Sequence, residues 1–130
     1  MCGIVGGTSE RNILPILVEG LRRLEYRGYD SAGVAFKKNG IISIVKNKGR
    51  VEQLAKKLNL KENQSNLGIA HTRWATHGIP SEKNAHPHHS KNIFVVHNGI
   101  IENHVDLRAY LKAEGIKFST QTDTEVIGHL

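Results

Sequence analysis

The chain opens with MCGIVGG, residues 1–7, a short apolar run between glycines whose second residue is the only cysteine of the protein. An apolar run bounded by glycines predicts a strand, and this strand would bury the amino terminus in a sheet. Removal of Met1 would leave Cys2 with a thiol and a free α-amine on the same residue. An α-amine has a pKa of about 7.7 to 8.0 and can accept the thiol proton at neutral pH. The position of Cys2 therefore predicts a nucleophile that carries its own base.

Cys2 also has a simpler interpretation, because a free cysteine is commonly a small buried apolar residue. Only the thiolate attacks a substrate, and an unperturbed thiol, with a pKa of about 8.5, holds little thiolate at neutral pH. Position 2 alone leaves both interpretations open, a packing residue and a catalytic thiol. The strand that follows favours the catalytic one, and a cysteine at this position permits removal of the initiator methionine.

Length and composition indicate one globular domain. The chain has 130 residues, 38% of them hydrophobic, and 13 glycines, which is enough for one packed core. No stretch approaches the roughly 20 apolar residues of a membrane span, and the amino terminus lacks the pattern of a signal peptide. A single cysteine forms no internal disulfide, which is typical of a reducing compartment. We therefore expect a soluble cytoplasmic protein without a membrane partner.

The formal net charge of +6 raises the question of nucleic-acid binding. Lysines and arginines are concentrated between residues 36 and 61, as they are in many nucleic-acid-binding surfaces. This segment has one aromatic residue on which a base could stack, Phe36, and it carries no nucleic-acid-binding motif. A solvated basic face is the better interpretation, and no nucleic-acid partner is expected.

Apolar residues at helical spacing predict a helix over residues 12–25, with Asn12 as its cap. Thr122 and Glu125 have the spacing of a capping box at the start of a last helix. The other expected helices span residues 51–58 and about 104–113. The last helix runs to the end of the chain without a stop signal, so we expect the chain to be the first part of a larger domain.

Strand formers flank Asn39-Gly40, the pair that most strongly predicts a two-residue hairpin turn. The expected strands are the opening run and residues 32–36, 41–45, 67–71, 93–96 and 116–119, of which 93–96 should be buried. Residues 72–92 contain two prolines and show no periodicity, so they predict a long loop, and loops of this length are usually functional. The elements alternate without a linker or repeat, which indicates a single mixed α and β domain.

Six blocks of residues resemble the class II glutamine amidotransferases. They are Cys2 to Gly6, LRRLEYRGYDSAG at 21–33, AHTRWATHG at 70–78, NAHPH at 84–88, VVHNGIIEN at 95–103 and TDTEVI at 122–127. The sequences of residues 26–33 and 71–78 resemble those of the sugar-phosphate branch of the family, the glucosamine-6-phosphate synthases. They resemble less the branches for purine biosynthesis, asparagine synthesis and glutamate synthesis. The resemblance covers nearly the whole chain and breaks only between about residues 36 and 66.

The resemblance implies an α+β fold, the four-layer αββα sandwich of N-terminal-nucleophile hydrolases, truncated at its carboxyl end. It implies that L-glutamine is hydrolysed through a glutamyl thioester on Cys2, with no cofactor. The ammonia would convert fructose 6-phosphate to glucosamine 6-phosphate on C-terminal sugar-phosphate-binding domains, which residues 1–130 do not include. The full-length protein would be a homodimer. Two alternatives stay open: a catalytically silent glutamine-binding fragment, and the glutaminase domain of another class II amidotransferase.

The resemblance also implies how glutamine is held. The Asn98 side-chain amide and the Gly99 N–H would stabilise the oxyanion, Arg73 would clasp the substrate carboxylate, and Asp123 would pair with its ammonium group. Each residue also has an interpretation that needs no substrate. Asn98-Gly99 is typical of a turn after a strand, Arg73 could be a surface arginine, and Asp123 could be an acid that favours a helix dipole.

Three more residues, Trp74, Thr76 and His77, resemble the family's loop that closes over glutamine and shields the thioester from water. Arg27 resembles the residue that steadies the amino terminus beside the thiol.

His86, His88 and His89 lie within four positions of the loop and invite a metal-site hypothesis. No cysteine or carboxylate accompanies them at a ligand-like spacing, and the expected chemistry needs no metal. We therefore expect these histidines to be structural and predict no metal site.

Overall fold

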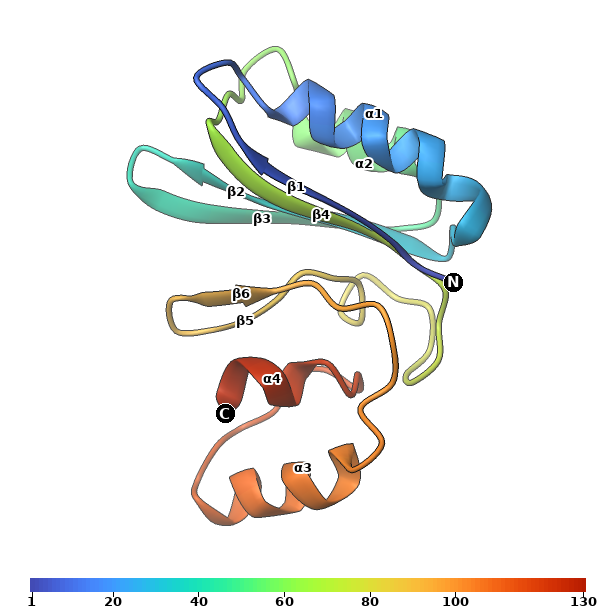
Figure 1. The fold of residues 1–130 in the computed structure, drawn as a ribbon, viewed down its shortest axis with the longest axis vertical. Coiled ribbons are helices and arrows are strands. Elements are labelled where there is room, and N and C mark those ends of the chain that lie inside the picture. Colours follow the sequence, from blue (N-terminus) through green and yellow to red (C-terminus); the bar gives the residue numbers. More distant parts are fainter.

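A computed structural model describes all residues from 1 to 130, and it arranges them in four layers (Figure 1). Helices α1 (Leu14–Leu24) and α2 (Val51–Leu58) cover the outer face of a four-stranded sheet. A two-stranded sheet lies next to the opposite face, and helices α3 (His104–Ala113) and α4 (Glu125–His129) lie beyond it. This order of helices, sheet, sheet and helices is the αββα arrangement that the resemblance implies.

The four-stranded sheet is antiparallel throughout and has the order β1-β4-β2-β3. Its strands are β1 (Gly3–Thr8), β2 (Ser31–Lys38), β3 (Ile41–Lys48) and β4 (Leu67–Arg73). Gly3 pairs with Thr72, so the residue before the first strand, Cys2, lies beside the residues that follow β4. The register of β1 and β4 therefore brings the amino terminus to the start of the long loop.

The predicted hairpin is confirmed. Lys38 pairs with Ile41, and the two residues between them, Asn39 and Gly40, have φ angles of 52° and 78°. Two positive φ angles in succession define the turn that suits the right-handed twist of paired strands, and asparagine followed by glycine adopts it most readily.

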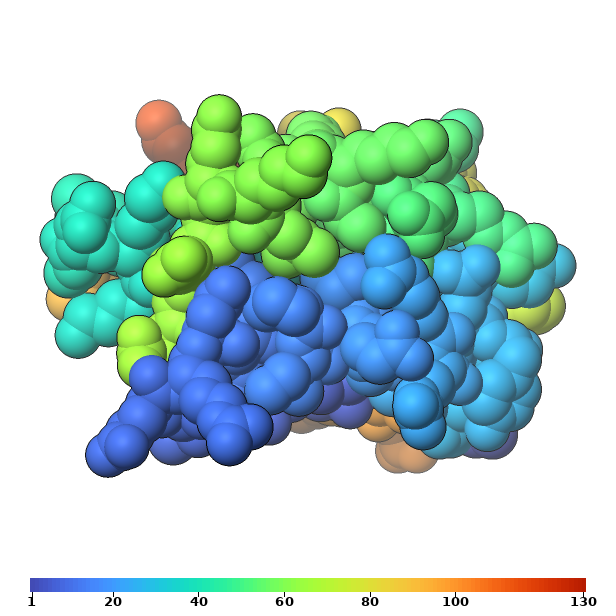
Figure 2. Space-filling view, turned by 90° about the horizontal axis from the view of Figure 1, so that it is seen from above, coloured from blue at the N-terminus to red at the C-terminus, as the bar shows by residue number.

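The main hydrophobic core lies between α1, α2 and the four-stranded sheet. Helix α1 buries the side chains that its sequence spacing predicts, and α2 contributes a second apolar face. The buried members from the two helices are Leu14, Leu17, Val18, Leu21, Val51, Leu54, Ala55 and Leu58. Full burial of each leucine or valine contributes roughly 1.5–3 kcal/mol to stability. Figure 2 shows the two helices from outside, covering this face of the sheet.

In the two layers beyond the four-stranded sheet, buried polar side chains outnumber buried apolar ones. The buried apolar side chains there are Ala85, Leu111 and Val126. The Glu125 carboxylate accepts hydrogen bonds from the backbone N–H groups of Ser119 and Thr120. Burial alone would raise the pKa of Glu125, but the hydrogen bonds that it accepts outweigh burial and lower its pKa to about 2.

Several local predictions are confirmed and several are wrong. The helices at 51–58 and 104–113 have the predicted bounds. The capping box at Thr122 and Glu125 is wrong, because Glu125 bonds to the preceding loop and Thr122 bonds to His88. Residues 116–119 form no strand. The two-stranded sheet, β5 (His88–Ser90) and β6 (Ile93–Val95), begins inside the predicted loop, and its β6 is only half-buried.

No helix of the structure combines the length and the apolar character that a membrane crossing would need.

Candidate active site

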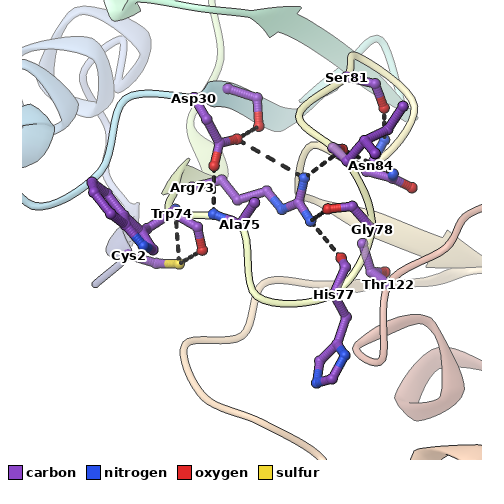
Figure 3. A network of polar contacts seen from close by, with 12 residues as sticks. Cys2, Asp30, Arg73, Trp74, Ala75, His77, Gly78, Ser81, Asn84 and Thr122 are labelled. Carbon is purple, nitrogen blue, oxygen red and sulfur yellow. Dashed lines mark hydrogen bonds and ion pairs between the residues drawn. The ribbon is translucent and has the colours of Figure 1, made fainter.

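Cys2 lies just before β1, beside the residues that follow β4 (Figure 3). Its sulfur accepts a hydrogen bond from the Trp74 backbone N–H at 3.3 Å. The same sulfur lies 3.7 Å from the Trp74 carbonyl oxygen, to which the thiol donates. The half-buried thiol is thus held by both backbone groups of one residue.

A small cavity opens beside this thiol and brings together residues from five distant segments. The side chains predicted for the site meet here, except those of Asn98 and Arg27. The lining residues are Cys2, Arg73, Trp74, Thr76, His77, His86, His97, Gly99, Thr122, Asp123 and Thr124. The cavity volume is only about 10 Å³, close to the space of one water molecule.

Asn98 and Gly99 follow β6, and Gly99 lines this cavity. The Asn98 Nδ2 donates to the carbonyl oxygen of Cys2 at 3.0 Å. The residue predicted to supply an oxyanion donor is therefore hydrogen-bonded to the residue predicted to supply the nucleophile. Gly99 has a φ of +151°, a conformation that other residues rarely adopt. A side chain there would also start 3.0 Å from the His97 ring.

Arg73 is 3% exposed, which excludes the surface-arginine interpretation. Its guanidinium donates to the carbonyl oxygens of His77, Gly78 and Ile79. Burial lowers the pKa of Arg73, while the nearby Asp30, Cys2 and Asp123 oppose that change. An arginine nevertheless stays charged in proteins, so the loop folds around a buried cation.

Asp123 is buried and precedes α4 by two residues. One of its oxygens, Oδ2, accepts a hydrogen bond from the Ile101 backbone N–H at 2.7 Å. The contact ties the segment after Asn98 to the segment before α4. Both segments supply walls of the cavity.

The loop residues Trp74, Thr76 and His77 differ in their surroundings. The Trp74 side chain is 52% exposed and meets the ring of Tyr29 edge-on at 6.2 Å. Thr76 is exposed, and the ring centroid of His77 lies 4.5 Å from that of His104.

Arg27 reaches the amino terminus, where its Nη2 lies 3.5 Å from the Met1 sulfur.

A buried pair of histidine rings, His71 and His86, lies at the cavity, which His86 lines, and the sequence analysis assigned no role to His71. The ring of His71 stacks on that of His86 with centroids 3.9 Å apart. Burial lowers the pKa of His71 to about 4, and burial together with neighbouring positive groups lowers the pKa of His86 further. Both rings are therefore neutral at physiological pH. His71 belongs to the block at 70–78 that resembles the family, and this feature of the sequence could have identified it as a residue of the site.

The histidine pair fixes His97, the residue before the predicted oxyanion donors. The Nε2 of His71 donates to the His97 carbonyl at 3.0 Å, and the His97 N–H donates to the His86 Nδ1 at 3.4 Å. The His97 ring also bonds to the Thr124 hydroxyl at 3.2 Å. His97 and Thr124 line the cavity, although sequence reasoning assigned neither to the site.

Of the three loop histidines considered for a metal site, His86 and His88 stay close, with ring centroids 4.5 Å apart, whereas His89 points elsewhere. His86 stacks on His71, His88 bonds to the Thr122 hydroxyl, and the ring of the exposed His89 packs on that of Phe94. No group of three or more histidine, cysteine or acidic side chains is arranged to hold a metal ion.

Comparison with known sequences finds close relatives. The chain is 60% identical to an isomerizing glutamine–fructose-6-phosphate aminotransferase of Shewanella oneidensis, and 61% identical to one of Pseudomonas aeruginosa. Both alignments cover the whole chain but only 22% of the relative. The chain thus spans about a fifth of the length of these relatives, and it aligns with their amino-terminal portion.

Comparison with solved structures identifies the same architecture in a glutamine phosphoribosylpyrophosphate amidotransferase from B. subtilis. The TM-score is 0.80 with 28% sequence identity, over 99% of this chain and 28% of that chain. A second structure, an allosteric regulatory enzyme of purine biosynthesis, gives 0.78 with 30% identity over the same shares. The family model of the glutamine amidotransferase domain matches residues 56–130. With Cys2 before its first strand, its αββα layers and this match, the chain belongs to the glutamine amidotransferase domain family.

Proposed function

We propose that this domain hydrolyses glutamine to glutamate and ammonia, with Cys2 as its nucleophile. The observation that carries the proposal is that Cys2, Arg73 and Asp123 line one cavity, while the Asn98 amide lies beside Cys2 and donates to its carbonyl oxygen. Glutamine hydrolysis needs a nucleophile, a proton carrier, oxyanion donors and a grip on the amino-acid end of the substrate. Cys2 supplies the nucleophile and, once Met1 is removed, the α-amine that carries the proton. Asn98 supplies an oxyanion donor, and Arg73 and Asp123 supply the grip.

The reaction begins when the Cys2 sulfur attacks the carbonyl carbon of the glutamine side-chain amide. The S–C bond forms, the C–N bond breaks, and the α-amine of Cys2 passes the thiol proton to the departing ammonia. Water then attacks the thioester, the C–O bond forms and the C–S bond breaks, which releases glutamate. The α-amine exists only after Met1 is removed, so the proposal requires that processing step.

Both steps place negative charge on the former amide oxygen, and fixed donors aimed at that oxygen lower the barrier. The Asn98 amide already lies 3.0 Å from the Cys2 carbonyl oxygen, which holds it next to the nucleophile. Its second N–H and the Gly99 N–H are the proposed oxyanion donors. Gly99 lets the backbone come close to the substrate because it has no side chain.

Arg73 and Asp123 are the proposed contacts to the substrate carboxylate and ammonium. The guanidinium has five N–H donors, and the loop carbonyls accept only three hydrogen bonds from it. The Asp123 Oδ2 is bonded to Ile101, which leaves the other oxygen for an ammonium. Thr76 and His77 would close over the bound glutamine, and Trp74 would shield the thioester from water.

In the full-length protein, we propose that the ammonia converts fructose 6-phosphate to glucosamine 6-phosphate. The relatives at about 60% identity carry the name isomerizing glutamine–fructose-6-phosphate aminotransferase, whereas identity to the glutamine phosphoribosylpyrophosphate amidotransferase is 28%. The remaining sequence of such relatives would supply the sugar-phosphate-binding domains and the homodimer contacts. A reactive thiol is best preserved in a reducing compartment, which supports a cytoplasmic location.

The test is to incubate the Met-processed protein with the glutamine analogue 6-diazo-5-oxo-L-norleucine and to map the adduct by mass spectrometry. A covalent mass on Cys2 together with glutamate release supports the proposal. A free amino-terminal Cys2 that neither reacts nor turns over glutamine, yet binds it in calorimetry, would instead identify a silent glutamine-binding module.

A further inference from the structure

One peptide group, between Trp74 and Ala75, separates the Cys2 thiol from the carboxylate of Asp30 (Figure 3). The carbonyl oxygen of this peptide is the Trp74 oxygen to which the thiol donates. Its N–H belongs to Ala75 and donates to the Asp30 Oδ2. The thiol and the carboxylate thus bind opposite sides of the same peptide plane.

Asp30 is firmly anchored at the start of β2. Its Oδ1 accepts the Ser31 hydroxyl at 2.7 Å, and its backbone N–H donates to the Arg73 carbonyl at 3.1 Å. Its own carbonyl accepts the Gly49 N–H at 2.8 Å. The side chain is 18% exposed, and its Oδ1 lies 3.9 Å from the Arg73 guanidinium. The carboxylate is therefore fixed to the sheet and balanced by a buried cation.

Asp30 is absent from the lining of the cavity, so it does not contact a bound substrate. We propose that Asp30 is a positioning residue that orients the Cys2 thiol through the Trp74–Ala75 peptide. This inference rests on the proposed function in one respect, that Cys2 is the nucleophile. It adds a residue to which neither the sequence nor the reaction steps above assign a role.

The physical reason is that a carboxylate is a strong, charge-assisted acceptor. Hydrogen bonds in a chain polarise one another, so a peptide whose N–H binds a carboxylate offers a better carbonyl acceptor to the thiol. The same anchor holds the Trp74 N–H, which donates to the sulfur. Loss of the anchor would let this backbone drift away from the thiol.

The test compares Asp30→Ala and Asp30→Asn with a matched control, Asp106→Ala, which removes an exposed carboxylate from the first turn of α3. We expect Asp30→Ala to lower kcat on the order of 10²-fold, the cost of a small misplacement of a reacting group. KM should change less than kcat, because Asp30 does not contact the substrate and the Arg73 guanidinium, 3.9 Å from Asp30, is also held by three loop carbonyls. Asp30→Asn keeps an acceptor for the Ala75 N–H and should restore most of kcat, while Asp106→Ala should leave both constants unchanged.

A loss that appears only in KM, or an Asp30→Ala variant with wild-type kcat, would overturn the proposal. Should Asp30→Ala fail to fold in a thermal-unfolding assay, Asp30→Glu carries the test. It keeps the charge but displaces the carboxylate, so kcat should fall. An Asp30→Glu variant with wild-type kcat would show that position is irrelevant.

A second readout, the rate at which iodoacetamide labels Cys2 at fixed pH, involves no glutamine. Asp30→Ala should slow labelling about fivefold to tenfold, the size of one hydrogen bond's contribution, because the Trp74 N–H that stabilises the thiolate would move away from the sulfur. Equal rates in Asp30→Ala and Asp106→Ala would contradict the proposal. If the wild-type protein releases no glutamate but labelling still depends on Asp30, the proposed function fails while the positioning role stands.

Discussion

The Asn98 side-chain amide donates to the carbonyl oxygen of Cys2 at 3.0 Å, although 96 positions separate the two residues in the chain. The bond joins the residue before the first strand to the turn after β6. It places a fixed N–H donor beside the thiol before any substrate arrives. Preorganised donors of this kind cost no rearrangement during the reaction, which makes them effective in catalysis.

Cys2→Ala should abolish glutamate release because no other side chain can form the thioester. Glutamine should still bind, since Arg73 and Asp123 are untouched. Coupled detection of glutamate measures the first expectation, and calorimetry with glutamine measures the second. Appreciable turnover by this variant would show that another group is the nucleophile.

Asn98→Ala should lower kcat on the order of 10²- to 10³-fold, the usual loss of one oxyanion donor. Steady-state kinetics separate this effect from binding. If only KM rises, then Asn98 contributes equally to the ground state and the transition state and merely binds glutamine.

Acidification should destabilise the fold through the buried histidines. The folded-state pKa is about 4 for His71 and about 3 for His88, below the value of about 6.5 for an unfolded histidine. Their contribution is therefore complete above about pH 6.5 and is lost as the pH falls toward the folded values. We expect each to remove on the order of 2–3 kcal/mol between pH 7 and pH 4, measured by urea unfolding.

The variant His71→Gln tests the source of this pH dependence. It should be less stable than the wild type at pH 7 but should lose less stability on acidification. The exposed His89 offers a control, because His89→Gln should leave the dependence unchanged. A wild-type protein that is equally stable at pH 7 and pH 4 would contradict the prediction.

Gly33→Ala should destabilise the domain by about 1–3 kcal/mol, the usual cost of overpacking. A Cβ at Gly33 would lie 1.9 Å from the His86 carbonyl oxygen, so the loop that crosses the sheet would have to shift. Gly6→Ala is the control, because its nearest contact is 3.4 Å. Urea unfolding measures the free energy of unfolding of both variants. Equal values would show that the loop at His86 can shift at little cost in free energy.

Local patterns in the sequence were enough to predict the elements whose structure depends on near neighbours. The Asn39-Gly40 turn and the helices at 51–58 and 104–113 follow from backbone preference and apolar spacing. The six blocks also identified the family and most of the residues around the cavity. Backbone preference and apolar spacing depend on a few neighbouring residues, and the six blocks are recognised from sequence similarity, so neither needs three-dimensional information.

Tertiary structure alone decided the contacts between distant polar groups. Glu125 resembled half of a capping box, yet it binds the backbone of Ser119 and Thr120 because the loop there offers unpaired N–H groups. The stacking of His71 on His86 and the link from Asp30 through Ala75 to the thiol depend on how β2, β4 and the long loop meet. Such pairs have no periodic signature, because each donor finds its acceptor only after the layers have packed.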